Sequence, residues 1–251
     1  MPKIALLSDI HGNIAALEKV VEDLKTRQVD QVFNLGDHVS GPLWPKETIQ
    51  FLMKQDWVHI RGNHDRQLGE QNPREHGPSD RYAFQMLNTA ELDWLRSLPP
   101  CVEIQDQFLL FHGTPTNDLT YLLETVAHGR GHLATPAEIT ARLGQTRSRI
   151  LLCGHSHIPR VTALSENVLI VNPGSVGLPA YDDIVPEYHV METGSPHARY
   201  AILENKDGHW QLEEIVLPYD HRQAADQARK NGRPDWELGL LTGFMQPGKA
   251  D

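Results

Sequence analysis

Residues 3–11 read KIALLSDIH, an apolar run that ends in an aspartate and a histidine. Four further stretches repeat this pattern, each with Asp, Asn or His where the apolar run breaks at small or glycine residues. They are residues 32–37 (VFNLGD), 58–65 (VHIRGNHD), 108–113 (FLLFHG) and 150–157 (ILLCGHSH). Short apolar runs of this kind are typical of strands buried in a parallel-type sheet. We therefore predict buried strands that leave polar side chains at their carboxyl ends.

Helical patterns separate the first three predicted strands. Residues 14–24 carry apolar side chains at helical spacing, and Asn13 stands where it can cap that helix. Residues 47–54 also read as a helix, after a loop marked by glycine and proline. The order strand, helix, strand, helix, strand favours right-handed crossovers and a layered α/β sheet.

Further strands and helices are predicted in the second half of the chain. Residues 101–104 and 108–111 read as one hairpin, and residues 199–204 and 211–217 as another. The tail from residue 221 to about residue 241 is predicted to be helical.

We expect a single domain over residues 1–251, because no repeat or low-complexity linker interrupts the chain. Three insertions, near residues 66–100, 113–149 and 178–197, are expected to form the walls or lid of a site. The first holds two short helical patterns, the second is polar and helical in patches, and the third reads as an exposed excursion.

Composition narrows the classes of partner. The chain has 251 residues and a net charge of −10, which argues against a broad nucleic-acid footprint because such binding is carried by clustered Lys and Arg. No apolar stretch approaches the roughly 20 residues of a membrane helix, and the amino terminus shows no leader pattern. We expect a cytoplasmic protein whose two cysteines are free thiols.

We interpret seven of the strand-end side chains as metal ligands. A single Asp or His at a strand end is more often a turn or cap residue, but five such blocks in series reverse that balance. Carboxylate and amide oxygens combined with imidazole nitrogens suit Mn²⁺, Fe²⁺, Ni²⁺ or Zn²⁺. The candidate ligands are Asp9, His11, Asp37, Asn63, His112, His155 and His157.

Seven ligands exceed the need of one tetrahedral ion but match a pair of ions if Asp37 bridges them. Two ions about 3.5–4 Å apart can share a hydroxide and neutralise phosphoryl oxygens during in-line displacement. Phosphoester hydrolysis is therefore the predicted reaction class.

The same residues resemble the five signature blocks of the calcineurin-like metallophosphoesterases, in that family's order. The blocks are Asp9-x-His11, Gly36-Asp37, Gly62-Asn63-His64-Asp65, His112-Gly113 and Gly154-His155-Ser156-His157. The resemblance spans about residues 3–175 and implies a four-layer α/β/β/α sandwich with metals at the carboxyl ends of the central strands. By this resemblance the first metal would be bound by Asp9, His11 and His157, the second by Asn63, His112 and His155, and both by Asp37.

The third block also supplies the predicted catalytic residues. The resemblance implies that His64 lies beside the leaving group as general acid, and Asp65 is expected to orient its imidazole. His38 is ambiguous, since it can reach the site or cap a loop, and we favour the second.

Two departures from relatives disfavour a protein phosphatase. Residues 36–42 (GDHVSGP) lack the arginine that protein Ser/Thr phosphatases and diadenosine tetraphosphate hydrolases carry after the second block. Asp65 also stands where those phosphatases have glutamate. The sequence is more similar to the small prokaryotic phosphodiesterase-type branch, which implies a phosphodiesterase with two divalent ions, Mn²⁺ being favoured in vitro.

Alternatives remain open at this point. The protein can instead be a phosphomonoesterase acting on a nucleotide or phosphoprotein, or a non-catalytic metal-binding scaffold. We expect a small phosphoester as substrate and a monomer or homodimer. His128 and His132 are expected to be exposed, and Arg130 between them is a possible substrate contact. The glycine-rich turn at residues 172–177 (NPGSVG) is interpreted as structural.

Overall fold

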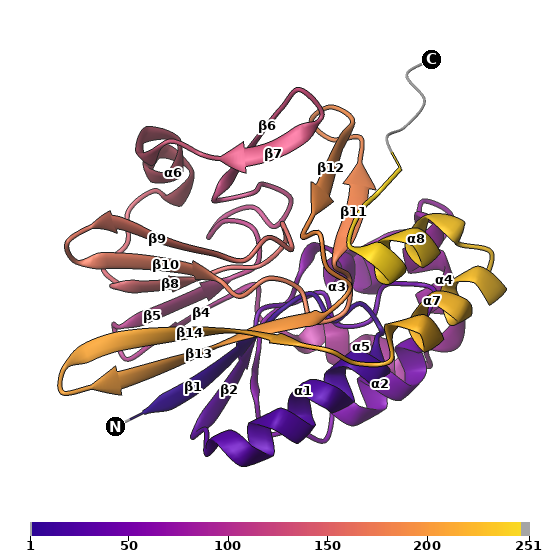
Figure 1. Cartoon of the computed structure of the whole chain (residues 1–251), viewed down its shortest axis with the longest axis horizontal. Coiled ribbons are helices and arrows are strands. Elements are labelled where there is room, and N and C mark those ends of the chain that lie inside the picture. The colour runs from indigo at the N-terminus through magenta and orange to yellow at the C-terminus, as the bar shows by residue number, and fades with distance from the viewer. Residues whose placement is uncertain (1, 247–251) are drawn as a thin grey trace.

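Two five-stranded sheets packed face to face form the centre of the molecule (Figure 1). The computed structural model describes residues 2–246. The strands of the first sheet are β1 (Lys3–Leu7), β2 (Gln31–Asn34), β3 (Val58–His59), β13 (Ala198–Lys206) and β14 (His209–Leu217). Their order is β14-β13-β1-β2-β3, and β1, β2 and β3 are parallel.

The second sheet repeats this arrangement with a parallel centre. Its strands are β4 (Cys101–Ile104), β5 (Phe108–Phe111), β8 (Ile150–Leu152), β9 (Arg160–Ser165) and β10 (Val168–Asn172). The order is β4-β5-β8-β10-β9, with β5, β8 and β10 parallel and the edge strands antiparallel. Both predicted hairpins, β4 with β5 and β13 with β14, are confirmed.

Alternation along the strands explains why the two sheets pack. In β1, Ile4 and Leu6 belong to the core between the sheets, whereas Ala5 and Leu7 belong to the core beneath the helices. In β5, Phe108 and Leu110 likewise face the first sheet. Successive side chains of a strand point to opposite faces, so an all-apolar strand is buried on both sides.

Helices cover both outer faces and complete four layers. Helix α1 (Ile14–Arg27) packs on the first sheet, and Asn13 caps it by accepting from the backbone N–H of Ala16, as predicted. Helix α6 (Pro136–Leu143) covers the second sheet through Ile139 and Leu143. The predicted α/β/β/α sandwich is therefore confirmed.

Further helices lie beside the strand ends. Helices α2 (Pro45–Leu52), α3 (Asn63–Glu70), α4 (Pro78–Met86) and α5 (Thr89–Ser97) share one apolar cluster. The tail forms α7 (His221–Lys230) and α8 (Pro234–Thr242), so its predicted helix is broken near residue 232. None of the helices within residues 2–246 combines the length and apolar character needed to cross a membrane.

A third, four-stranded sheet was not predicted. It contains β6 (Glu124–Ala127), β7 (Arg130–Leu133), β11 (Ala180–Asp183) and β12 (His189–Glu192), in the order β11-β12-β7-β6. Within residues 113–149 the predicted helical patch is α6, but the prediction did not include the β6–β7 hairpin, in which Ala127 and Arg130 pair across a two-residue turn. The prediction of an exposed excursion at residues 178–197 was wrong: β12 buries His189, whose Nε2 lies 3.0 Å from the Tyr121 hydroxyl.

The packed sheets give a direct stability prediction. Leu6 is fully buried between them, and we expect Leu6→Ala to lower the free energy of unfolding by about 2–5 kcal/mol. Denaturant titration measures this change. The control is Leu133→Ala, which removes a 54% exposed leucine from β7. An equal loss for both variants would contradict the burial argument.

Candidate metal centre and the cavity around it

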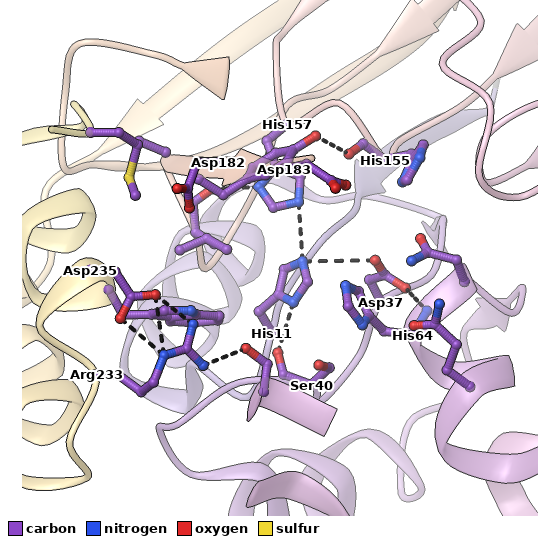
Figure 2. Close-up of a pocket in the computed structure, with 18 of the residues that line it drawn as sticks. His11, Asp37, Ser40, His64, His155, His157, Asp182, Asp183, Arg233 and Asp235 are labelled. Atoms are coloured by element: carbon purple, nitrogen blue, oxygen red, sulfur yellow. Dashed lines mark hydrogen bonds and ion pairs between the residues drawn. The ribbon is translucent and has the colours of Figure 1, made fainter. Parts of the chain in front are cut away.

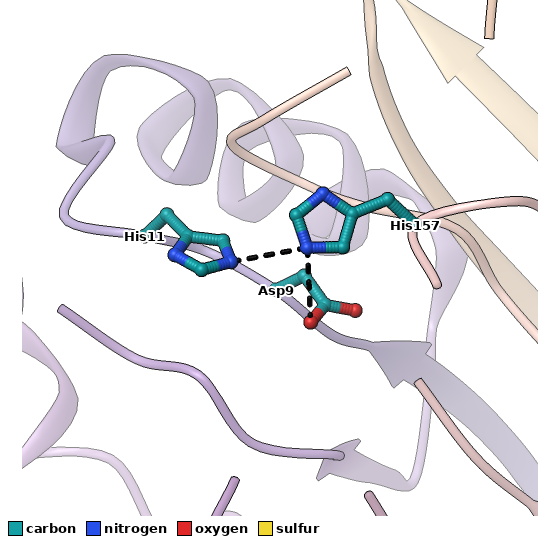
Figure 3. Close-up of side chains that lie close together, drawn as sticks. All are labelled: Asp9, His11 and His157. Carbon is teal, nitrogen blue, oxygen red and sulfur yellow. Dashed lines mark hydrogen bonds and ion pairs between the residues drawn. The ribbon is translucent and has the colours of Figure 1, made fainter. Parts of the chain in front are cut away.

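All five blocks follow the carboxyl ends of parallel strands. The blocks after β1, β2 and β3 meet those after β5 and β8 at one edge of the sandwich. Two groups of side chains there bring their ligand atoms within 4.8 Å of one another. One group is Asp9, His11 and His157 (Figure 3), and the other is Asp37, His112 and His155.

Three histidines of these groups present the same ring nitrogen to the centre. The Nδ1 atoms of His11, His112 and His157 lie 2.7–2.8 Å from the backbone carbonyl oxygens of Ser40, Leu35 and Leu178. Each Nδ1–H therefore donates to a carbonyl, so that Nε2 of the neutral ring has its lone pair available for a metal. The Nε2 atoms of His11 and His157 are only 3.1 Å apart.

Each of the two carboxylates uses one oxygen for a backbone hydrogen bond and turns the other toward the centre. Asp9 Oδ2 accepts from the backbone N–H of His155, and Asp37 Oδ1 accepts from that of His64. The other oxygens point into the centre. Asp37 Oδ2 lies 3.2 Å from His112 Nε2 and 3.8 Å from His11 Nε2, and so faces both groups.

The donor set fits divalent cations. Asp9 Oδ1 is buried and has no hydrogen-bond partner within residues 2–246, although His157 Nε2 is 3.4 Å away. Asn63 adds an amide oxygen, its Oδ1 lying 3.1 Å from His112 Nε2. Unpaired buried carboxylate oxygens and facing imidazole lone pairs are costly without a positive charge between them.

Backbone conformation aims these side chains. Asp9, His11, Asp37, His155 and His157 all have positive φ, between 51° and 70°. This left-handed conformation costs of order 1–3 kcal/mol per residue where L side chains are concerned. It persists because the surrounding loops hold it.

Those loops are joined by backbone hydrogen bonds. Asp9 N–H donates to Gly36 O and His11 N–H to Asp37 O, both at 3.0 Å. The turn at residues 172–177 braces the first block, because Ser175 Oγ donates to Asp9 O and a side chain at Gly177 would meet Ile10 O at 1.8 Å. The turn contacts backbone, as its structural interpretation requires.

The histidines of the centre differ in protonation. Burial, then the neighbouring His157, lowers the pKa of His11 to about 4. Burial also tends to lower the pKa of His112, but the Asp37 carboxylate outweighs it and raises this pKa to about 10. Near neutral pH the metal-free protein therefore carries a proton on His112 but none on His11.

A cavity of about 430 Å³ opens above the two groups (Figure 2). His11, Asp37, Asn63, His155 and His157 contribute to its lining. Figure 2 shows Asp37 and His64 on one side of His11, with Arg233 and Asp235 on the other. The cavity thus extends well beyond the ligand groups in more than one direction.

Asp80, which the sequence analysis missed, is the partner of His64. The ring Nδ1 of His64 lies 2.8 Å from Asp80 Oδ1, and Ser40 Oγ donates to the same oxygen at 2.6 Å. Burial tends to lower the pKa of His64, but Asp80 and then Asp37 raise it to about 10. The ring keeps its proton at neutral pH while Nε2 remains for the cavity.

The expectation that Asp65 orients His64 was wrong. Asp65 is fully buried and accepts from the backbone N–H groups of Gly62, Asp37 and His38. It also contacts the His38 ring, with Nδ1 2.7 Å from Oδ2. Its oxygens are therefore occupied by hydrogen bonds that join the second block to the third. His38 is buried among these bonds and does not line the cavity, in agreement with its interpretation as a loop-capping residue.

The tail forms part of the cavity, which was also missed. Arg233, Asp235 and Trp236 lie at the start of α8 and line the cavity. Figure 2 shows Arg233 and Asp235 across His11 from His64. The ring of Trp236 meets the ring of His11 edge-on, with centroids 6.0 Å apart. No short-range pattern marks these residues, because packing of α8 on Leu43 and Leu178 brings them in.

The insertions contribute unequally to the walls. Residues of β11 line the cavity, including Tyr181, Asp182 and Asp183. His128 and His132 are exposed as predicted. Arg130 lies outside this cavity and pairs with Glu192 at 2.6 Å, so the predicted option of a substrate contact gains no support.

Comparison with known proteins shows which family this chain resembles in sequence and fold. The family model described as the calcineurin-like phosphoesterase superfamily domain matches residues 2–196. A metallophosphoesterase from Sphaerobacter thermophilus shares the fold with a TM-score of 0.73 at 24% identity, over 96% of this chain and 100% of that chain. A hypothetical protein from Pyrococcus horikoshii OT3 has a TM-score of 0.72 and 19% sequence identity, and the match covers 98% of this chain and 100% of that chain.

A match by sequence also covers nearly the whole chain. An uncharacterized protein of Methanocaldococcus jannaschii is 27% identical over 257 residues, which cover 93% of this chain and 94% of that protein. The matching family model, together with the shared fold and the paired His/Asp groups, places the chain among the metallophosphoesterases. The chain belongs to the calcineurin-like phosphoesterase superfamily.

Metal binding should stabilise the protein, because the cation interacts with the facing imidazole lone pairs and with the unpaired Asp9 oxygen. At a free Mn²⁺ concentration 100 times Kd we expect the free energy of unfolding to rise by about 2.7 kcal/mol. For a chain of this length that is a rise in Tm of about 5–10 °C. Thermal unfolding with and without chelator measures it, and His11→Ala should reduce the response. An unchanged Tm with Mn²⁺, Ni²⁺ and Zn²⁺ would contradict a metal centre here.

Metal binding should also release a proton from His112. The pKa of His112 is raised to about 10 in the metal-free protein, whereas a histidine ring must be neutral to bind a metal. Affinity should therefore rise about tenfold per pH unit between pH 7 and 9, and fall as pH decreases. Calorimetry in two buffers of different ionisation enthalpy counts the protons. Affinity independent of pH in this range would refute the assignment.

Proposed function

We propose that this protein is a dinuclear metal-dependent phosphodiesterase that hydrolyses a small phosphodiester. The observation that carries the proposal is the pairing of two His/Asp groups at the base of a cavity whose wall holds His64, with its Nδ1 hydrogen-bonded to Asp80. One ion would be held by Asp9, His11 and His157, the other by Asn63, His112 and His155, and Asp37 would bridge them.

The ions divide the chemistry with the side chains. When bound, two divalent cations supply Lewis-acid activation of water and neutralise charge on the phosphoryl oxygens. The oxygen and nitrogen donors suit Mn²⁺, Fe²⁺, Ni²⁺ or Zn²⁺, and we propose Mn²⁺ as the ion that supports activity in vitro.

His64 is proposed as the general acid. With Nδ1 held by Asp80, its Nε2–H is available to the leaving-group oxygen as the ester bond breaks. Asp80 is a positioning residue in this scheme, since it fixes the tautomer and the ring plane, and Ser40 in turn orients Asp80. Asp65 is proposed to position Asp37 through the backbone of the second block.

Charge around the cavity favours a diester over a monoester. A monoester carries a second negative charge near the phosphorus atom, which extra cationic side chains usually stabilise. Arg233 is the only Lys or Arg that lines the cavity within residues 2–246, and Asp235 pairs with it at 2.6 Å. Asp182 and Asp183 add negative charge to the same lining.

The reaction class can be tested with chromogenic esters. We expect Mn²⁺-loaded protein to hydrolyse bis(4-nitrophenyl) phosphate faster than 4-nitrophenyl phosphate. Asp37→Asn should lose most activity and part of the bound metal, whereas Asp56→Asn, an exposed position outside the cavity, should lose neither. Faster monoester turnover would replace the proposal by a phosphomonoesterase. Absence of turnover with metal bound would favour a scaffold.

The general acid has its own signature. His64→Ala should retain both metals and lower kcat by about 10²–10⁴-fold for alkyl leaving groups, with a far smaller effect for 4-nitrophenol. Asp80→Asn should show the same dependence on the leaving group in weaker form. Metal content by mass spectrometry and rates for a series of leaving groups check this. Equal losses for all leaving groups would exclude proton donation by His64.

A further inference from the structure

Most of the wall of the cavity opposite His64 comes from a part of the chain that the family model does not cover. That model ends at residue 196, whereas Arg233, Asp235 and Trp236 belong to α8 and its N-cap. In Figure 2, Arg233 and Asp235 lie across His11 from Asp37 and His64. We call Arg233, Asp235, Trp236 and Ser79 the α8 wall.

Arg233 is held firmly in this wall. Its Nε and Nη2 atoms donate to Asp235 at 3.0 and 2.6 Å, and Nη1 donates to Ser79 Oγ at 2.7 Å. A guanidinium has five N–H donors, so two remain after these three bonds are made. Because the fork is already fixed, little rotamer entropy is lost when it binds a ligand.

Trp236 couples this guanidinium to the metal centre. The Arg233 guanidinium carbon lies 5.6 Å from the centroid of the Trp236 ring. The same ring meets His11 edge-on, and it touches Gly41 so closely that a side chain there would lie 2.6 Å from the indole. Arg233 is therefore held at a fixed offset from the ligand groups, separated from His11 by the indole.

Hydrogen-bond acceptors accompany the two free donors. Asp182 of β11 is exposed and lines the cavity, and its side chain makes no hydrogen bond or ion pair within residues 2–246. Asp183 is committed to its own turn, where it accepts from the N–H groups of Ile184 and Val185. The region offers donors and acceptors together but no net positive charge, because Asp235 neutralises Arg233.

We infer that the α8 wall with Asp182 binds the hydroxyl groups of the alcohol that the phosphodiester carries. A hydroxyl group both donates and accepts, which matches the Arg233 N–H groups and the Asp182 carboxylate that line the same cavity. A second phosphate would meet the unpaired Asp182 and is disfavoured. The substrate class is thus a singly charged diester of a small polyol, glycerol-like or ribose-like. This inference rests on the proposed function, and it assigns the specificity of that site.

Two product analogues of equal charge test the inference. Glycerol 3-phosphate and propyl phosphate have the same carbon chain and the same phosphate, and only the first has hydroxyl groups. Calorimetric titration of Mn²⁺-loaded protein at pH 8 should give a Kd about tenfold lower for glycerol 3-phosphate, as expected of one or two hydrogen bonds of ordinary net strength. Ribose 5-phosphate, titrated alongside, distinguishes a ribose-like from a glycerol-like alcohol.

Variants connect this preference to the α8 wall. Arg233→Gln and Asp182→Ala should each reduce the Kd ratio of the two ligands to about threefold or less. The Asp182 side chain makes no hydrogen bond within the described residues, so its replacement leaves folding intact even if Arg233→Gln loosens α8. Asp56→Ala, an exposed aspartate outside the cavity, is the matched control and should keep the wild-type ratio.

The outcomes distinguish a failure of the polyol site from a failure of the proposed phosphodiesterase function. Equal Kd values of the two ligands for wild type, or a ratio that both variants leave unchanged, would overturn the α8 wall as the polyol site. Turnover of bis(4-nitrophenyl) phosphate by wild type reports on the proposed function separately. If that diester is hydrolysed while the Kd ratio is one, only the specificity inference fails.

Discussion

Everything in this protein depends on holding the ends of five strands from two sheets within a few ångströms of one another. Side-chain packing between the sheets fixes their distance, but the final alignment comes from backbone hydrogen bonds such as Asp9 N–H to Gly36 O and Gly154 N–H to His112 O. These bonds keep several of the candidate ligand residues in left-handed conformations that they would not adopt alone. The ligand geometry is consequently a property of the fold rather than of any one loop.

Much of the fold and the grouping of the candidate ligands could be predicted from the sequence, because both follow from short local patterns. A strand buried on two faces has to be apolar throughout, so Lys3–Leu7 and Phe108–Phe111 are recognisable without their neighbours. The ligand types then follow directly at each strand end. Parallel strands bring their carboxyl ends to one edge, which is why residues as distant as Asp9 and His157 could be grouped in advance.

What escaped prediction is created by tertiary contact. Asp80 reaches His64 only because α4 packs beside α3, and its sequence context resembles any helix start. Asp65 stood directly after His64 and seemed its natural partner, yet three backbone N–H groups and His38 compete for its oxygens. The third sheet was hidden for the same reason, since β11 and β12 contain Asp, His and Glu and are stabilised by distant β7.

The close approach of the second and third blocks has a wider consequence. A side chain at Gly62 would lie 2.2 Å from Asp37 Oδ1, so nothing can be inserted between these loops. The α8 wall and β11, by contrast, attach through helix packing and strand pairing at the rim. The loops proposed to carry the chemistry are rigidly constrained, while the wall proposed to face the alcohol is attached only at the rim. Substitutions at the rim can therefore alter the lining of the cavity without moving the paired His/Asp groups.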